Sequence, residues 1–190
     1  IGGAERVAVN IAKSPTVGME YHLVEVVRGN GEFSQSFIKE LHDCGICFHR
    51  SYITNNKIAI ILFPLWFIYL SLKWKPQIIH THTEIPDLSI YLWYKMFGWI
   101  FPGTKYVRTI HNTELWNQWP QIGCKVEAFF KKRHANIAIS QSTQLCYKQI
   151  YGEIPQIIFN GLQSVKQNKF KYIIANKINI LFAGRLEYQK

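Results

Sequence analysis

Short apolar runs alternate along the chain with longer stretches in which apolar residues recur every three or four positions. The short runs predict strands at 21–27, 46–49, 77–81, 105–110, 136–140 and 156–159. The longer stretches predict helices at 4–14, 35–42, from 58 to a stop at Lys75-Pro76, and at 86–97, 121–134 and 141–151. Strands that alternate with helices in this way indicate an α/β fold, a doubly wound parallel sheet with helices on its faces.

The first predicted helix follows Gly2-Gly3 directly, with no strand before it. In a doubly wound sheet the strand before such a glycine turn lies in the middle of the sheet. We therefore expect the first strand to be missing, in a first domain that covers residues 1–162. The polar, lysine-rich stretch 163–177 is predicted to be a connector, and 178–190 to begin a second domain with a new strand.

An apolar run from Ile58 to Leu70 has two interpretations. A helix that spans a bilayer needs about twenty apolar residues, and this run is shorter and contains Pro64. It is either a buried helix packed on the sheet or, together with the aromatic stretch at 90–101, a surface that contacts a membrane interface. The aromatic residues of the second interpretation are Trp66, Tyr69, Trp74, Trp93, Tyr94 and Trp99, with lysines nearby.

The net charge of +10 favours an anionic partner. We expect no nucleic-acid partner, because the chain has no cluster of lysine and arginine and no recognised nucleic-acid-binding module. A phosphorylated substrate and an acidic membrane surface remain as possible anionic partners.

The four cysteines are scattered, although Cys44 and Cys47 have the spacing of a redox or zinc motif. A second such pair is absent, and the pair leads into a strand instead of opening a helix. We interpret the cysteines as reduced thiols of a cytosolic protein.

Three histidines stand at the carboxyl ends of predicted strands, where open α/β sheets bind their ligands: His80, His82 and His111. His80 and His82 would point to opposite sides of an extended strand, and no third ligand is near, so we expect no metal site. A histidine at such a position is as often a structural hydrogen-bonding group. Glu84 and Asp87 are expected to be solvated residues that cap a helix.

Two further features suit an anion. Gly2 and Gly3 precede a helix N-terminus, whose free N–H groups and partial positive charge attract a phosphate. Arg185 and Lys190 follow the last predicted strand and would suit a diphosphate, although taken alone they are more simply explained as surface charge. The chain contains neither a P-loop nor a nucleophile elbow.

These motifs together resemble the family 4 glycosyltransferases of the GT-B fold, in which two Rossmann-like domains face each other across a cleft. The matching stretches, in chain order, are Gly2-Gly3-Ala4-Glu5-Arg6, Ile78-Ile79-His80-Thr81-His82, Val107-Arg108-Thr109-Ile110-His111-Asn112, Ala138-Ile139-Ser140, Ile158-Phe159-Asn160-Gly161 and Phe182-Ala183-Gly184-Arg185-Leu186-Glu187 with Lys190. Each stretch is loose by itself, and their order and spacing carry the resemblance.

The resemblance implies roles for particular residues. His111 matches the active-site histidine that contacts the transferred sugar, and His80 and His82 match a strand end on the acceptor side. Gly2, Gly3, Arg185 and Lys190 match residues that bind the donor diphosphate. Asn112 stands where the family commonly has an acidic residue, so we assign it no catalytic duty. The resemblance implies no cofactor and no metal. Residues 1–190 contain no D-x-D cluster, which a metal-dependent transferase would use to hold its ion.

The implied reaction is transfer of a sugar from a nucleoside diphosphate sugar to a hydroxyl acceptor, with retained anomeric configuration. We expect a hexosyltransferase of cell-surface polysaccharide or glycolipid synthesis, cytoplasmic or at the inner face of the membrane. The partners would be the donor, a saccharide or lipid-linked acceptor, and an anionic membrane surface. The alternatives are a non-catalytic nucleotide- or anion-binding module and a GT-B-type sugar-nucleotide epimerase. Residues 1–190 alone are expected to be inactive, because most of the donor domain would lie beyond them.

Overall fold

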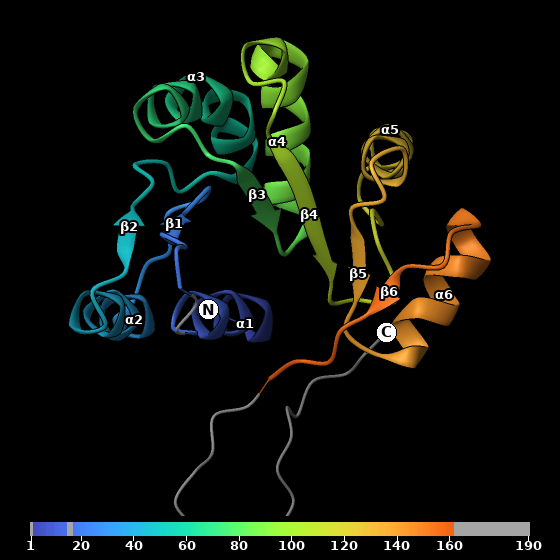
Figure 1. Cartoon of the computed structure of the whole chain (residues 1–190), viewed down its shortest axis with the longest axis horizontal. Coiled ribbons are helices and arrows are strands. Elements are labelled where there is room, and N and C mark those ends of the chain that lie inside the picture. Colours follow the sequence, from blue (N-terminus) through green and yellow to red (C-terminus); the bar gives the residue numbers. More distant parts are fainter. Residues whose placement is uncertain (1, 15–16, 162–190) are drawn as a thin grey trace, which may run out of the picture.

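The computed structural model describes residues 2–14 and 17–161. Helices and strands alternate through them, as Figure 1 shows. The helices are α1 (Gly3–Ala12), α2 (Glu32–Asp43), α3 (Asn56–Trp74), α4 (Glu84–Phe97), the 3₁₀ helix η1 (Gly98–Ile100), α5 (Pro120–Lys131) and α6 (Gln141–Tyr151). The strands are β1 (His22–Val24), β2 (Cys47–His49), β3 (Ile78–Thr81), β4 (Lys105–Ile110), β5 (Asn136–Ala138) and β6 (Gln156–Ile157). Each predicted element of the first domain is present, whereas the predicted connector and second domain lie outside the described residues.

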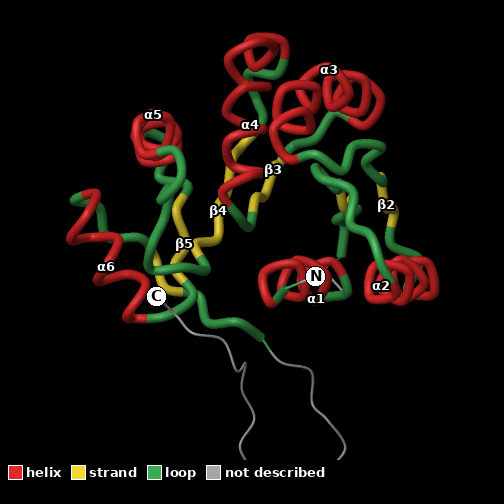
Figure 2. The backbone as a smooth tube through the Cα atoms, turned by 180° about the vertical axis from the view of Figure 1, so that it is seen from behind, coloured by secondary structure: helices red, strands yellow, loops and turns green. Residues whose placement is uncertain are grey.

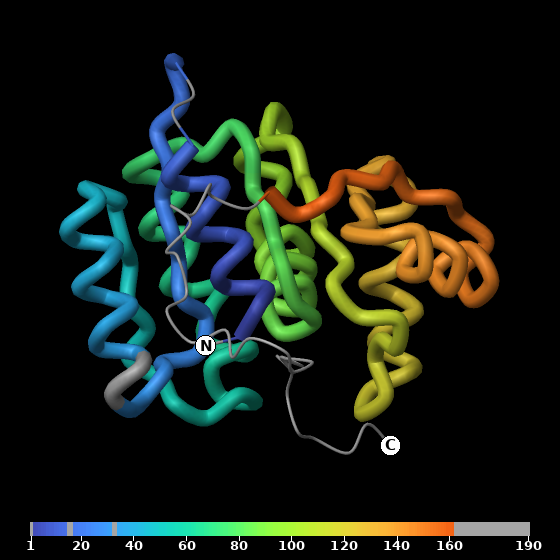
Figure 3. The backbone as a smooth tube through the Cα atoms, turned by 90° about the horizontal axis from the view of Figure 1, so that it is seen from below, coloured from blue at the N-terminus to red at the C-terminus, as the bar shows by residue number. Residues whose placement is uncertain are grey.

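All strand pairs are parallel, and they form two sheets, β1-β2 and β3-β4-β5-β6. Helices α3, α4 and α5 lie on one side of the strands and α1, α2 and α6 on the other (Figures 1 and 2). Seen from below, α2, α1 and α6 form the front layer (Figure 3). This confirms the α/β fold with parallel sheets. No described strand pairs with both β1 and β3, so the two sheets are separate among the described residues.

Local sequence explains where the helices begin and end. The Asn55 side chain accepts hydrogen bonds from the backbone N–H groups of the first turn of α3, at 3.0 and 3.2 Å. Lys75 ends that helix in the left-handed conformation, with φ of 47°, and Pro76 prevents its continuation. At α6, Ser140 caps the first turn and Gly152 ends the last with φ of 69°.

Helix α3 has two unlike faces. One face packs on α4 in the main core, where the Phe67 and Trp93 rings meet edge to face with centroids 5.3 Å apart. The other face is exposed and apolar, and each of its residues has another three or four positions away: Ile58, Ile61, Leu62, Leu65, Tyr69 and Leu72. By length and composition α3 is the one described helix that could cross a bilayer, although 39% of its apolar window is buried.

The aromatic residues considered for a membrane interface are therefore divided between the core and the surface. Trp93 is fully buried, so the interpretation is wrong for that residue. Tyr69, Trp74 and Trp99 are exposed. Trp66 and Tyr94 are half-buried and pack against the core. A membrane contact through the exposed residues stays a prediction.

Candidate active site

The three predicted histidines lie together where β3 and β4 end. His80 and Thr109, on these neighbouring strands, are joined by a hydrogen bond of 2.8 Å between Nε2 and Oγ1. The Nδ1 atom of His82 lies 3.2 Å from the Nε2 atom of His111, a hydrogen bond whose direction depends on the tautomers. The structure therefore brings together His80, His82 and His111.

The expectation that His80 and His82 point to opposite sides is wrong. Strand β3 ends at Thr81, so His82 is not held by the alternation of an extended strand. Its ring centroid lies 4.2 Å from that of His80.

These two side chains still do not share a ligand position in the described structure. Nε2 of His80 is bonded to Thr109, whereas Nδ1 of His82 faces His111. The absence of a metal at this cluster stays a prediction.

The histidines are held in their neutral form at neutral pH. Burial, helped by the neighbouring imidazoles, lowers the pKa of His80 to about 4 and that of His82 to about 3. Burial also lowers the pKa of His111, and the Glu5 carboxylate opposes this effect. A neutral His111 can use one ring nitrogen toward His82 and offer Nδ1 to a bound molecule.

Glu5, whose carboxylate acts electrostatically on His111, stands in the first turn of α1. In that turn the Gly2 N–H donates a hydrogen bond of 2.7 Å to Oε2 of Glu5. A Cβ atom added to Gly3 would meet nothing within 4 Å, and neither glycine has a positive φ. Chain conformation does not require a glycine at Gly3, and the open space beside it allows a ligand to approach the helix N-terminus.

Beneath the histidines lies a buried ion cluster that sequence reasoning missed. Arg108, 1% exposed, forms an ion pair with Oδ2 of Asp87 and donates a hydrogen bond to Oε2 of Glu127, both at 2.7 Å. Trp116 and Tyr147 also donate hydrogen bonds to the Glu127 carboxylate. Two carboxylates face one guanidinium, and burial raises the pKa of Asp87 to about 6 although Arg108 opposes this.

The prediction that Asp87 and Glu84 are solvated capping residues is therefore wrong. Asp87 is 1% exposed and paired with Arg108, and the Glu84 carboxylate accepts a hydrogen bond from the backbone N–H of Trp116. The only sequence signal was the position of Arg108 three residues before His111. Its partners are 19 and 21 positions away, so no local pattern revealed them.

A small pocket connects the two groups. It lies between the histidines and the buried ions, and its lining residues include His82, His111, Asn112, Asp87 and Arg108. Arg185 and Lys190, the two predicted diphosphate-binding residues of the second domain, lie outside the described residues.

Comparison with known proteins bears on the chemistry of this site. The sequence profile of the family described as Glycosyltransferase Family 4 matches residues 1–164, which include every described residue. Searches among curated proteins and among solved structures found no match. The profile spans most of the chain and agrees with the parallel α/β fold and with the motifs around His111. The chain therefore belongs to glycosyltransferase family 4.

Proposed function

We propose that the intact enzyme transfers a hexosyl group from a nucleoside diphosphate sugar to a hydroxyl acceptor, with retained anomeric configuration. The observation that carries this proposal is the cluster of His80, His82 and His111 at the ends of β3 and β4, within the residues that match glycosyltransferase family 4. A diphosphate at the free N–H groups of α1 would place its sugar next to the histidines. Family membership favours this reaction over the non-catalytic module and the epimerase.

The chemical task is to stabilise the negative charge that develops on the departing diphosphate. The N-terminus of α1 supplies aligned N–H dipoles, and Gly2 and Gly3 permit close approach of the phosphates. We assign Arg185 and Lys190 to the same diphosphate from the second domain, with bidentate and point-charge contacts respectively. In this proposal the protein's own cations and dipoles stabilise the charge on the diphosphate, and no cofactor takes part.

His111 acts in this proposal as a hydrogen-bonding residue that holds the transferred sugar. Because its pKa is lowered by burial, the imidazole is neutral and pairs with a sugar hydroxyl through Nδ1. His82, bonded to Nε2 of His111, fixes the orientation of that ring. We place the acceptor on the side of His80 and His82.

The exposed face of α3 supports an acceptor at a membrane. Six large apolar side chains form a continuous stripe on this face, between Lys57 at one end and Lys73 and Lys75 at the other. An apolar stripe with flanking lysines fits the interface of an anionic bilayer. We propose a lipid-linked saccharide or a growing surface polysaccharide as acceptor, at the cytoplasmic face of the membrane.

The reaction is tested by incubating the intact enzyme with a panel of nucleoside diphosphate sugars and simple hydroxyl acceptors. We expect release of the nucleoside diphosphate and a glycoside whose anomeric configuration, assigned by NMR coupling constants, equals that of the donor. An inverted product would overturn the retaining mechanism. A 2-epimeric sugar nucleotide as the product would overturn the transferase assignment.

The membrane part is tested separately, with two leucines that are equally exposed. Leu65 on α3 and Leu145 on α6 are each 55% exposed. Because burial of a leucine side chain stabilises by about 1.5–3 kcal/mol, Leu65→Glu should weaken binding to anionic vesicles by about tenfold or more. Leu145→Glu should leave vesicle co-sedimentation unchanged. Equal binding by both variants would remove α3 as the membrane contact.

A further inference from the structure

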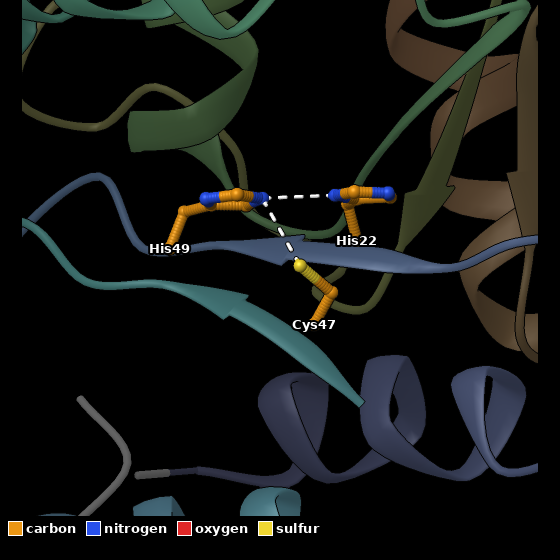
Figure 4. A group of neighbouring side chains, drawn as sticks. All are labelled: His22, Cys47 and His49. Atoms are coloured by element: carbon orange, nitrogen blue, oxygen red, sulfur yellow. Dashed lines mark hydrogen bonds between the residues drawn. The ribbon is translucent and has the colours of Figure 1, made fainter. Parts of the chain in front are cut away.

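The second sheet carries a cluster of three potential metal ligands. His22 on β1 lies directly opposite Cys47 on β2 in the parallel register. Cys47 and His49 are two residues apart on β2, so their side chains lie on the same face of the sheet. Figure 4 shows the three side chains on this face, with both dashed contacts converging on Nε2 of His49.

The distances between the ligand atoms suit a single tetrahedral ion. Nδ1 of His22 lies 2.9 Å from Nε2 of His49, and Sγ of Cys47 lies 3.6 Å from the same nitrogen. Around Zn²⁺, with its usual bond lengths and tetrahedral angles, two nitrogens are about 3.4 Å apart and a nitrogen and a sulfur about 3.6 Å. A small rotation of the two rings would open the first distance to that value. Among the described residues this is the one group of three or more His, Cys, Asp or Glu side chains close enough to share an ion.

A neighbouring carboxylate orients one of the ligands. Oε1 of Glu20 lies 3.1 Å from Nε2 of His22, the ring nitrogen that faces away from the cluster. A proton held at Nε2 by this carboxylate leaves the lone pair of Nδ1 directed toward Cys47 and His49. Histidines that bind metal ions usually have such a partner, which fixes the tautomer and raises ligand basicity.

The surroundings favour a bound cation over a reactive thiol. The three ligands are half-buried, and the Trp74 ring from the end of α3 covers His22 at a centroid distance of 4.3 Å. Cys44, the other cysteine of the C-x-x-C pair, is exposed at the end of α2 and is not part of the group.

We propose that His22, Cys47 and His49 bind a Zn²⁺ ion that fastens β1 to β2. Water would take the fourth coordination position. A parallel pair of three residues per strand has few hydrogen bonds of its own, so a bond network through one ion would add directly to its stability. The cluster lies on the β1-β2 sheet, whereas His111 follows β4 of the other sheet, so the ion has no part in sugar transfer.

The test uses Co²⁺ as a spectroscopic substitute for Zn²⁺ in the intact protein. We expect a near-ultraviolet charge-transfer band from the thiolate and intense visible bands typical of tetrahedral coordination, both displaced by one equivalent of Zn²⁺. Absence of the thiolate band would overturn the proposal.

Substitutions assign the ligands, with the affinity for Zn²⁺ measured by competition with a chromogenic chelator. Cys47→Ala and His49→Gln should each lower the affinity by about 100-fold or more, and Glu20→Gln, which acts through His22, by about tenfold. Cys44→Ala and His42→Gln, at exposed positions nearby, are the matched controls and should bind as the wild type does.

Folding of each variant is checked by circular dichroism without metal, so that loss of binding is not confused with loss of fold. Should Cys47→Ala fail to fold, His49→Gln and Glu20→Gln decide the question. Equal loss of affinity in Cys44→Ala and Cys47→Ala would show adventitious binding by surface thiols and would overturn the proposal.

Discussion

Two histidine clusters, one on each sheet, differ in what surrounds the imidazoles. At the ends of β3 and β4, His80, His82 and His111 contact each other and Thr109, above the buried Arg108 cluster. On β1 and β2, His22 and His49 have a thiol beside them and Glu20 behind them. Both clusters arise because parallel strands bring residues far apart in the sequence into register.

The difference lies in the groups that accompany the rings. Neutral imidazoles close to one another and to a helix N-terminus form a polar surface that can hold sugar and phosphate by hydrogen bonds. A thiol with two imidazoles, one oriented by a carboxylate, forms a set of soft metal ligands. The chemistry therefore follows from the partners of each histidine, because histidine itself is common to both clusters.

The largest effect on stability is expected from a substitution in the buried Arg108 cluster, which accompanies the histidines of β3 and β4 and has no counterpart at the β1-β2 cluster among the described residues. Arg108→Met would leave Asp87 and Glu127 buried without their cation, and breaking a buried pair costs about 3–5 kcal/mol. We expect the free energy of unfolding, from denaturant titration of the intact enzyme at pH 7, to fall by that amount. Arg6→Ala, which removes an exposed pair with Glu40, should cost less than about 1 kcal/mol. Equal losses in the two variants would show that the cluster does not anchor the site.

A smaller change in the free energy of unfolding is expected when the pH is lowered. Below about pH 6.5 an unfolded imidazole binds a proton, whereas native His80 stays neutral down to about pH 4. The unfolded state then binds more protons, so stability falls as the pH falls through this window. Asp87 acts in the opposite direction between about pH 6 and 4, because its native carboxyl is protonated first.

His80→Gln removes the contribution of His80 to the pH dependence of stability, since the amide side chain does not titrate. Between pH 6 and 4.5 the variant should lose stability less steeply than the wild type, by about 1 kcal/mol per pH unit. At pH 8 the imidazole is neutral in the folded and the unfolded state. The difference in the free energy of unfolding between the two proteins at that pH therefore measures the effect of the substitution apart from protonation. Parallel pH profiles would show that His80 is not kept neutral in the native state.

Much of the fold could be predicted from the sequence because its signals are local. Strand β4 and helix α6 have the bounds that the apolar periodicity predicted, with Ser140 and Gly152 as cap and stop. The exposed apolar face of α3 could not be predicted in this way. Its apolar residues surround the helix, so only packing on α4 could show which face is buried.

The parts of the sites that sequence reasoning missed depend on contacts between distant residues. Burial of Asp87 requires Arg108, which reaches it from β4 and is itself paired with Glu127 of α5. The meeting of His22 with Cys47 requires the register of two strands 25 positions apart. The nearness of His80 and His82 depends on the end of β3 at Thr81, which was predicted correctly. The error was to extend the alternation of the strand one residue further, to His82.

Turnover by His111→Ala in the intact enzyme tests the central claim most directly, since this residue of the histidine cluster is assigned the contact with the transferred sugar. Loss of a hydrogen bond to the reacting sugar should lower kcat by about 100-fold or more, with an unchanged unfolding midpoint. His42→Ala, an exposed histidine on α2, is the control and should keep wild-type turnover. Near-normal turnover of a folded His111→Ala enzyme would contradict the account and remove His111 from the active site.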